Sequence, residues 1–193
     1  MLGRVRLPLL IWRVRGLGFT LAAAVAMFAV LMVVPRDAQE IPGRLGIYSF
    51  VWPLVPALGA AFLPLVSMRT DSPSDWTAPK FKRRRAVDLA LFVVVAGVPV
   101  FWRADLSVHV MLRNQLLFVG LSAVAVRLVG PAAAWVPLSC CVMVVWLLGT
   151  SDGGTPYSWA LPLLPPSSAV AAVASLAVAC LGVISYVSAP ARD

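Results

Sequence analysis

Residues 168–187 read SAVAAVASLAVACLGVISYV, and this stretch decides the fold class of the chain. It contains no charged side chain, and about 20 consecutive apolar residues are enough for a helix to cross the hydrocarbon core of a bilayer. The whole chain of 193 residues is 61% hydrophobic and 12% charged. A soluble domain is about 45–50% apolar and about 25% charged. The composition therefore predicts an integral membrane protein with little room for a soluble domain.

Further apolar runs precede this stretch and predict an all-α, polytopic transmembrane helical bundle of about six spans. The predicted spans are 17–34, 47–67, 87–102, 114–128, 132–148 and 168–187. They form a membrane domain at 17–188, between a basic interfacial segment at 1–16 and a short tail at 189–193. The first run is longer than the core of about 7–15 residues in a signal peptide, so we expect it to be retained. The third and fourth runs are short, which leaves a four-span arrangement open.

Basic residues predict the orientation, because loops on the cytoplasmic side carry an excess of Lys and Arg. With the N-terminus inside, twelve of the 16 basic residues lie in inner segments and four in outer ones. The outer ones are Arg36, Arg44, Arg103 and Arg113. We expect both termini to be cytoplasmic.

The loops between the runs differ in character. We predict a short loop at 35–46 and a wet outer loop that holds Arg103, Asp105, His109 and Arg113. Gly130–Pro131 predicts a tight turn between the fourth and fifth spans. The Pro- and Gly-rich residues 149–167 also carry aromatic side chains, which suits a segment that lies at the outer interface or folds back into the protein.

No catalytic, cofactor or metal site is predicted. His109 is the only histidine and has no further ligands near it in sequence, so neither a metal site nor a proton relay is expected. Cys140, Cys141 and Cys180 lie inside apolar runs without CxxC spacing, and we interpret them as small apolar side chains. The chain has no Walker A loop and no hydrolase motif, so we expect that it is not an enzyme.

Ionisable residues inside a span are functional candidates by default. Asp88 and Arg127 are the nearest cases, and both lie near the predicted cytoplasmic boundary, where a side chain can reach water. The basic residues flank apolar runs, which indicates lipid headgroups and not nucleic acid as their partner.

Small residues predict where helices pack. Ala171, Ser175 and Ala179 recur at four-residue spacing, which lets helix backbones approach closely in lipid. The spacing suits packing within the chain or between two membrane subunits.

The most polar stretch of the chain, 68–85, follows the second predicted span. Its acidic and aromatic residues precede a basic run; the candidates for docking a partner are Asp75, Trp76, Lys80, Lys82, Arg83, Arg84 and Arg85. The basic run anchors the topology on the cytoplasmic side, and it also suits a docking surface.

This arrangement resembles the small permease subunits of bacterial ATP-binding-cassette exporters. The resemblance covers the basic N-terminal segment, six spans, a cytoplasmic loop after the second span and a structured outer connector before the last. It implies that a separate cytoplasmic ATPase docks on the loop, and that the subunit pairs with an identical or different membrane subunit. The abundance of Arg, Ala, Val, Pro and Gly is typical of a GC-rich bacterial genome, so the expected location is a bacterial plasma membrane. The alternative is a non-catalytic membrane scaffold or assembly factor.

Overall fold

The computed structural model describes residues 37–50, 53–54, 86–87 and 107–188, together with Ala29 and Val33. Within these residues the chain is mostly helical. The helices are α6 (Val108–Val129), α7 (Trp135–Leu148) and α8 (Ala169–Ser188), with a single 3-10 turn, η1 (Leu161–Leu163), before α8. The predicted helical class is confirmed for this part of the chain.

Two of these helices, α6 and α8, are long and apolar enough to cross a bilayer. Helix α7 is apolar but has only 14 residues, which corresponds to a length of about 21 Å. The predicted first and third spans lie almost wholly outside the described residues, and so does most of the second.

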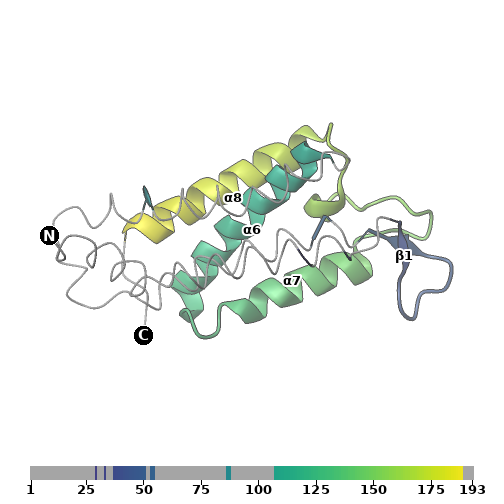
Figure 1. Ribbon diagram of the computed structural model, residues 1–193, viewed down its shortest axis with the longest axis horizontal. Coiled ribbons are helices and arrows are strands. Elements are labelled where there is room, and N and C mark those ends of the chain that lie inside the picture. Colours follow the sequence, from purple (N-terminus) through teal and green to yellow (C-terminus); the bar gives the residue numbers. More distant parts are fainter. Residues whose placement is uncertain are drawn as a thin grey trace, which may run out of the picture.

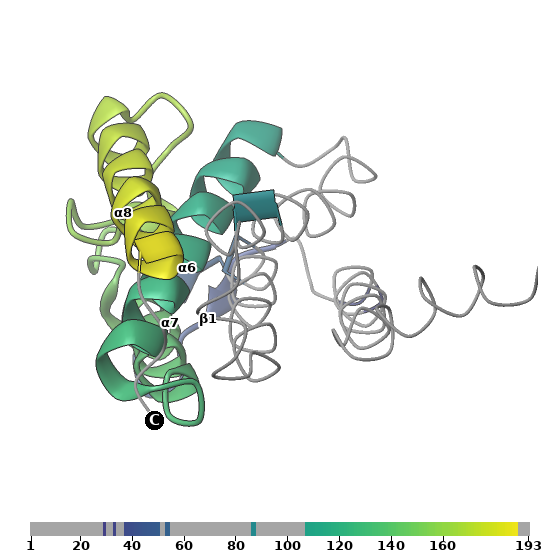
Figure 2. The same cartoon turned by 90° about the vertical axis from the view of Figure 1, so that its left-hand side faces the viewer.

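Helix α6 lies between α7 and α8 (Figures 1 and 2). It runs parallel to α8, because the first turns of α6 contact the residues before α8 while Gly120, near its middle, contacts Val178 and Ala179. Helix α7 runs back in the opposite direction. The three helices therefore alternate in direction along the chain, as successive crossings of a membrane do.

The turn between α6 and α7 confirms the prediction at Gly130–Pro131. Helix α6 ends at Val129, and Gly130 has a φ of 79°, a conformation that a residue without a Cβ adopts easily. Residues 131–134 complete the turn, and α7 begins at Trp135.

A small hairpin lies at the other end of the helices (Figure 1). Its strands, β1 (Gln39–Glu40) and β2 (Tyr48–Ser49), are antiparallel, with Gln39 opposite Ser49. The prediction that the second span begins at Ile47 is therefore wrong, since residues 48–49 form a strand. Hydrogen bonds from Ile41 N to the Ile47 carbonyl (2.8 Å) and from Gly46 N to Glu40 Oε1 (2.8 Å) close the hairpin and satisfy backbone groups that a helix would have paired internally.

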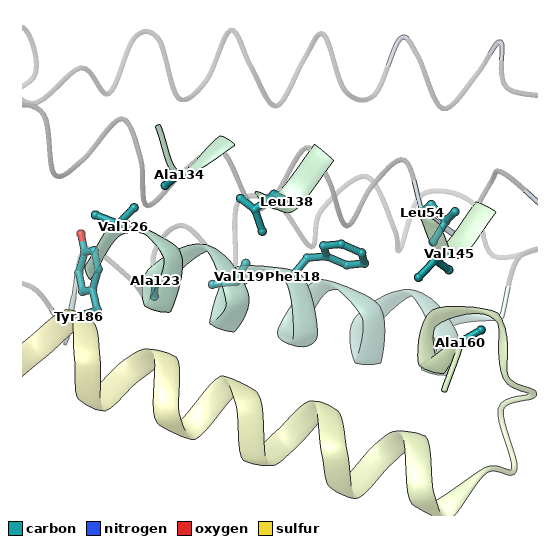
Figure 3. Close-up of a cluster of buried hydrophobic side chains, with 10 residues drawn as sticks. All are labelled: Leu54, Phe118, Val119, Ala123, Val126, Ala134, Leu138, Val145, Ala160 and Tyr186. Carbon is teal, nitrogen blue, oxygen red and sulfur yellow. The ribbon is translucent and has the colours of Figure 1, made fainter. Parts of the chain in front are cut away.

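The hydrophobic core is formed mainly between α6 and α7 (Figure 3). Phe118, Val119 and Val126 of α6 face Leu138 and Val145 of α7. Other members of the cluster come from neighbouring segments; they are Leu54, Ala123, Ala134, Ala160 and Tyr186. Phe118, Val126 and Tyr186 are fully buried, so this cluster fixes α6 as the central element of the described part.

Candidate functional site

The start of α6 carries three consecutive polar residues that are all buried. Arg113, Asn114 and Gln115 have exposed fractions of 8%, 0% and 1%. Buried polar groups in proteins are hydrogen-bonded, and a buried charge needs strong partners. The partners of Arg113 and Asn114 lie mainly in the segment between α7 and α8, residues 149–168, which we call the connector.

The Arg113 guanidinium donates to three backbone carbonyls of the connector. Nη1 donates to the Pro165 oxygen at 3.0 Å, and Nη2 donates to the oxygens of Leu164 at 2.9 Å and Pro162 at 3.3 Å. Nε donates to Asn114 Oδ1 at 3.2 Å. The planar fork of arginine suits such a set of acceptors, because its donors point in fixed, divergent directions.

Asn114 completes the same contact. Its Nδ2 donates to the Pro162 oxygen at 2.8 Å and to the Pro53 oxygen at 3.2 Å. The amide therefore joins three separated parts of the chain: residues 53–54, α6 and the connector. We refer to the Arg113 and Asn114 side chains together as the latch.

The proline content of the connector explains why it needs donors from outside. Pro162 and Pro165 have no N–H group, so this stretch cannot form a regular hydrogen-bonded ladder. Ser168 N donates to the Pro165 oxygen at 3.1 Å, but the oxygens of Pro162 and Leu164 take donors from outside the connector, and a buried carbonyl without a donor is costly. The latch supplies those donors from α6.

A second contact ties the hairpin to the end of α7. Arg44 Nη1 donates to the carbonyl oxygens of Leu147 (3.2 Å) and Thr150 (3.1 Å), and Nη2 forms a salt bridge with Asp152 at 2.7 Å. The last carbonyls of a helix lack intrahelical partners and carry partial negative charge, so a cation there is favourable. The Thr150 hydroxyl donates to the buried Ser49 hydroxyl at 3.2 Å.

The connector has a buried and an exposed side. Ala160 is fully buried and Pro162 is also buried, whereas Tyr157 and Trp159 are 43% and 49% exposed. Their rings stack with centroids 6.3 Å apart. The segment therefore folds back onto the helices, which is one of the two predicted arrangements, and it also presents two aromatic side chains outward.

The placement of Arg113 and His109 corrects a prediction. Both were expected in a wet outer loop before a span that starts at Asn114, but both lie in α6, which begins at Val108. His109 is exposed there, and Arg113 is buried. The helix extends through Arg113 because the connector carbonyls solvate the guanidinium in place of water.

Sequence reasoning missed the latch, although a signal was present. Apolar residues continue on both sides of Arg113, at Val110, Met111, Leu116 and Leu117. A polar group embedded in such a run has to face protein and not lipid. Nothing in the sequence pairs it with a proline-rich segment some fifty positions away.

The small residues of α8 lie on its contact with α6. Ala171 and Ser175 are buried, with exposed fractions of 0% and 1%. A Cβ added at Gly120 would lie 2.8 Å from the Ala179 Cα, so the backbones of α6 and α8 are close at that level.

The remaining candidates have simpler placements. Arg127 lies in the last turn of α6, near the end where the sequence placed it. Asp88 and the docking candidates Asp75, Trp76, Lys80, Lys82, Arg83, Arg84 and Arg85 lie outside the described residues. Cys140, Cys141 and Cys180 are free thiols, and no group of three potential metal ligands occurs among the residues that the structure describes.

The fold and the latch define a class: a helical protein with membrane-length helices and a folded connector held against them. Comparison with protein-family models, with curated proteins and with solved structures gave no match.

Proposed function

We propose that this chain is a multi-pass protein of a bacterial plasma membrane and the permease-type subunit of an ATP-binding-cassette export system. In this proposal it works with a separate ATPase. The observation that carries the proposal is the connector, which is folded, tied to α6 by the latch and placed directly before the last apolar helix. A structured outer connector in this position is what the resemblance to small export permeases implies.

The geometry of the three helices supports a multi-pass arrangement. Helices α6, α7 and α8 correspond to the fourth, fifth and sixth predicted spans, and they alternate in direction. Arg127 lies at one end of α6, and Arg113 lies near the other. Helix α7 is shorter than the hydrocarbon thickness of about 30 Å, so a crossing there requires flanking residues or local thinning of the bilayer.

A partner ATPase is part of the proposal because the chain has no nucleotide-binding motif of its own. In the proposed topology residues 68–85 are cytoplasmic, and the basic run that ends at Arg85 presents positive charge to an acidic face of the ATPase. Trp76 supplies a large aromatic side chain of the kind that dominates binding energy at protein interfaces.

Co-purification tests this proposal. The tagged chain is co-expressed with a candidate ATPase encoded by a neighbouring gene and extracted in mild detergent. Replacing Trp76 by Ala together with Lys80, Lys82, Arg83, Arg84 and Arg85 by Gln should abolish recovery of the ATPase. The matched control replaces Arg13 and Arg15 by Gln, which removes basic charge from the same predicted side and should leave recovery intact. Undiminished recovery with the loop variant would refute the docking role.

One observation favours the alternative of a membrane scaffold or assembly factor. The buried polar groups of the latch are all used on backbone carbonyls and on each other, so they stabilise the fold and do not line a path for a solute. Transport assays in vesicles that contain the ATPase separate the two functions. ATP-dependent movement of a solute supports the permease, whereas ATPase recruitment without transport supports the scaffold.

A further inference from the structure

Helix α8 has two unlike sides. The side toward α6 is made of small or polar residues and one tyrosine: Ala171, Ser175, Gly182 and Tyr186 are buried. A Cβ added at Gly182 would lie 2.5 Å from the Cα of Gly120, so the two backbones touch at this level. This side of α8 packs against α6.

The other side of α8 is exposed and entirely apolar. Val170, Val173 and Ile184 have exposed fractions of 67%, 68% and 63%. The other exposed residues on this side are Ala172, Leu176, Ala177, Cys180, Leu181 and Val183. At about 100° per residue, these positions spread over roughly half of the helix circumference.

The width and chemistry of this surface indicate what covers it. A second protein helix packs along a narrower stripe, and close association of helices in lipid favours small residues at the contact. Ala171, Ser175 and Gly182 lie on the side toward α6, whereas Val, Leu and Ile make up most of the exposed half. Protein-binding apolar patches are commonly rimmed by polar residues, and the exposed half of α8 contains none.

The length of the surface also indicates that lipid covers it. The apolar helix from Ala169 to Val187 has 19 residues, or about 28 Å, close to the hydrocarbon thickness of about 30 Å. At its start lie the Pro-rich end of the connector and the Arg113 guanidinium, where a polar boundary is expected.

We propose that the outward half of α8 is a lipid-facing wall, in direct contact with acyl chains across the hydrocarbon core. Pairing with another membrane subunit then uses a different surface of the chain. This inference rests on the bilayer placement in the proposed function and not on the ATPase.

The native thiol of Cys180 provides a probe in the middle of the proposed wall. In a variant with Cys140→Ala and Cys141→Ala, Cys180 is labelled with bimane in detergent, and the protein is reconstituted into phosphatidylcholine vesicles. Some of the lipid carries a nitroxide near the middle of its acyl chain. We expect the nitroxide lipid to remove most of the bimane fluorescence.

The matched control places the label on the connector. In the variant that combines Asp152→Cys with replacement of all three native cysteines by Ala, the label sits on a residue whose side chain is 88% exposed at the end of the helices. The same acyl-chain nitroxide should quench it little. An elution profile equal to that of the unmodified protein shows that both variants are folded.

Three results would overturn the proposal. If Cys180 formed disulfide-linked dimers in membranes under mild oxidation, a second copy of the chain would lie on this surface. If Cys180 reacted with a membrane-impermeant maleimide in intact vesicles, its side chain would be exposed to water and not to lipid. A bimane label that the acyl-chain nitroxide does not quench would mean that another part of the chain covers it. All three outcomes are independent of ATPase binding, so they are distinguishable from failure of the proposed function.

Discussion

Arg113 has a positively charged side chain that is 8% exposed, and its observed acceptors are backbone carbonyls and one amide oxygen. Arginine tolerates this environment better than lysine, because its charge is delocalised and more weakly hydrated. The oxygens of Pro162 and Leu164 also benefit, because their donors come from the latch. The contact is therefore reciprocal: the connector solvates Arg113, and Arg113 holds the connector.

Removing the guanidinium should release the connector. In Arg113→Met the side chain keeps similar bulk, but the Leu164 oxygen loses its donor, whereas the Pro162 oxygen keeps Asn114 Nδ2 and the Pro165 oxygen keeps Ser168 N. A carbonyl that stays buried without a donor costs roughly 1–3 kcal/mol. We expect faster hydrogen exchange at the amides of Ala160, Leu161 and Leu163, whose acceptors lie inside the connector region. Hydrogen-exchange mass spectrometry in nanodiscs measures this directly.

Asp152→Asn is the control for that measurement. The Asp152 carboxylate pairs with Arg44 but is 88% exposed, and exposed ion pairs contribute about 0–1 kcal/mol. Exchange in the connector should change little in this variant. If Arg113→Met left exchange at these amides unchanged, the latch would not be what holds the connector.

At the scale of elements, the contact between α6 and α8 depends on small residues, above all Gly120. Gly120 lies so close to α8 that an added Cβ would sit 2.5 Å from the Val178 carbonyl oxygen. Backbone atoms cannot move aside as the end of a flexible side chain can. In the proposed bilayer placement hydrophobic burial would not drive the two helices together, so close packing of this kind would be a main source of their affinity.

Gly120→Val should therefore separate α6 from α8. Overpacking of this kind costs about 1–3 kcal/mol, and here the backbone of one helix has to shift. We expect a lower midpoint of thermal unfolding in detergent, measured by circular dichroism or by size-exclusion chromatography after heating.

Ala177→Val is the matched control, because it adds two methyl groups on the exposed side of α8. Its unfolding midpoint should stay close to that of the native protein. An equal drop in both variants would show that the effect comes from added volume anywhere on these helices and not from the contact at Gly120.

At the scale of the whole molecule, the described residues have two ends of different character. One end carries the hairpin, the connector and the latch, and the other carries the turn between α6 and α7 (Figure 1). The distribution of basic residues over the chain predicts that the first end is outside and the second is cytoplasmic.

Cysteine accessibility in whole cells tests this orientation. In a background without native cysteines, Asp152→Cys should react with a membrane-impermeant maleimide, since the residue is exposed on the connector. Ala133→Cys, in the exposed turn at the opposite end, should react only after the cells are permeabilised. The reverse pattern would invert the topology and remove the basis for a cytoplasmic docking loop.

The sequence predicted apolar helices well where a single run was long and uninterrupted. The run at 168–187 corresponds to α8, and the turn at Gly130 was found from its residue type. The sequence-based prediction failed where a polar group is hydrogen-bonded to another part of the fold. Arg113 was interpreted as part of a loop, because its acceptors lie some fifty residues away in the sequence. Ile47–Ser49 was interpreted as the start of a span, because the hydrogen bonds that close the hairpin are not visible in the sequence pattern.

The sequence by itself predicted that this chain belongs in a bilayer, because lipid is the solvent that accepts so many apolar side chains with so few charges. It also determined which run forms the last helix and which end of the chain is basic. Only the tertiary structure decided which half of α8 meets α6 and which half is left outward. It alone placed Arg113 among the connector carbonyls, because the energy of a buried charge depends on the groups that surround it in space and not on its neighbours in the chain.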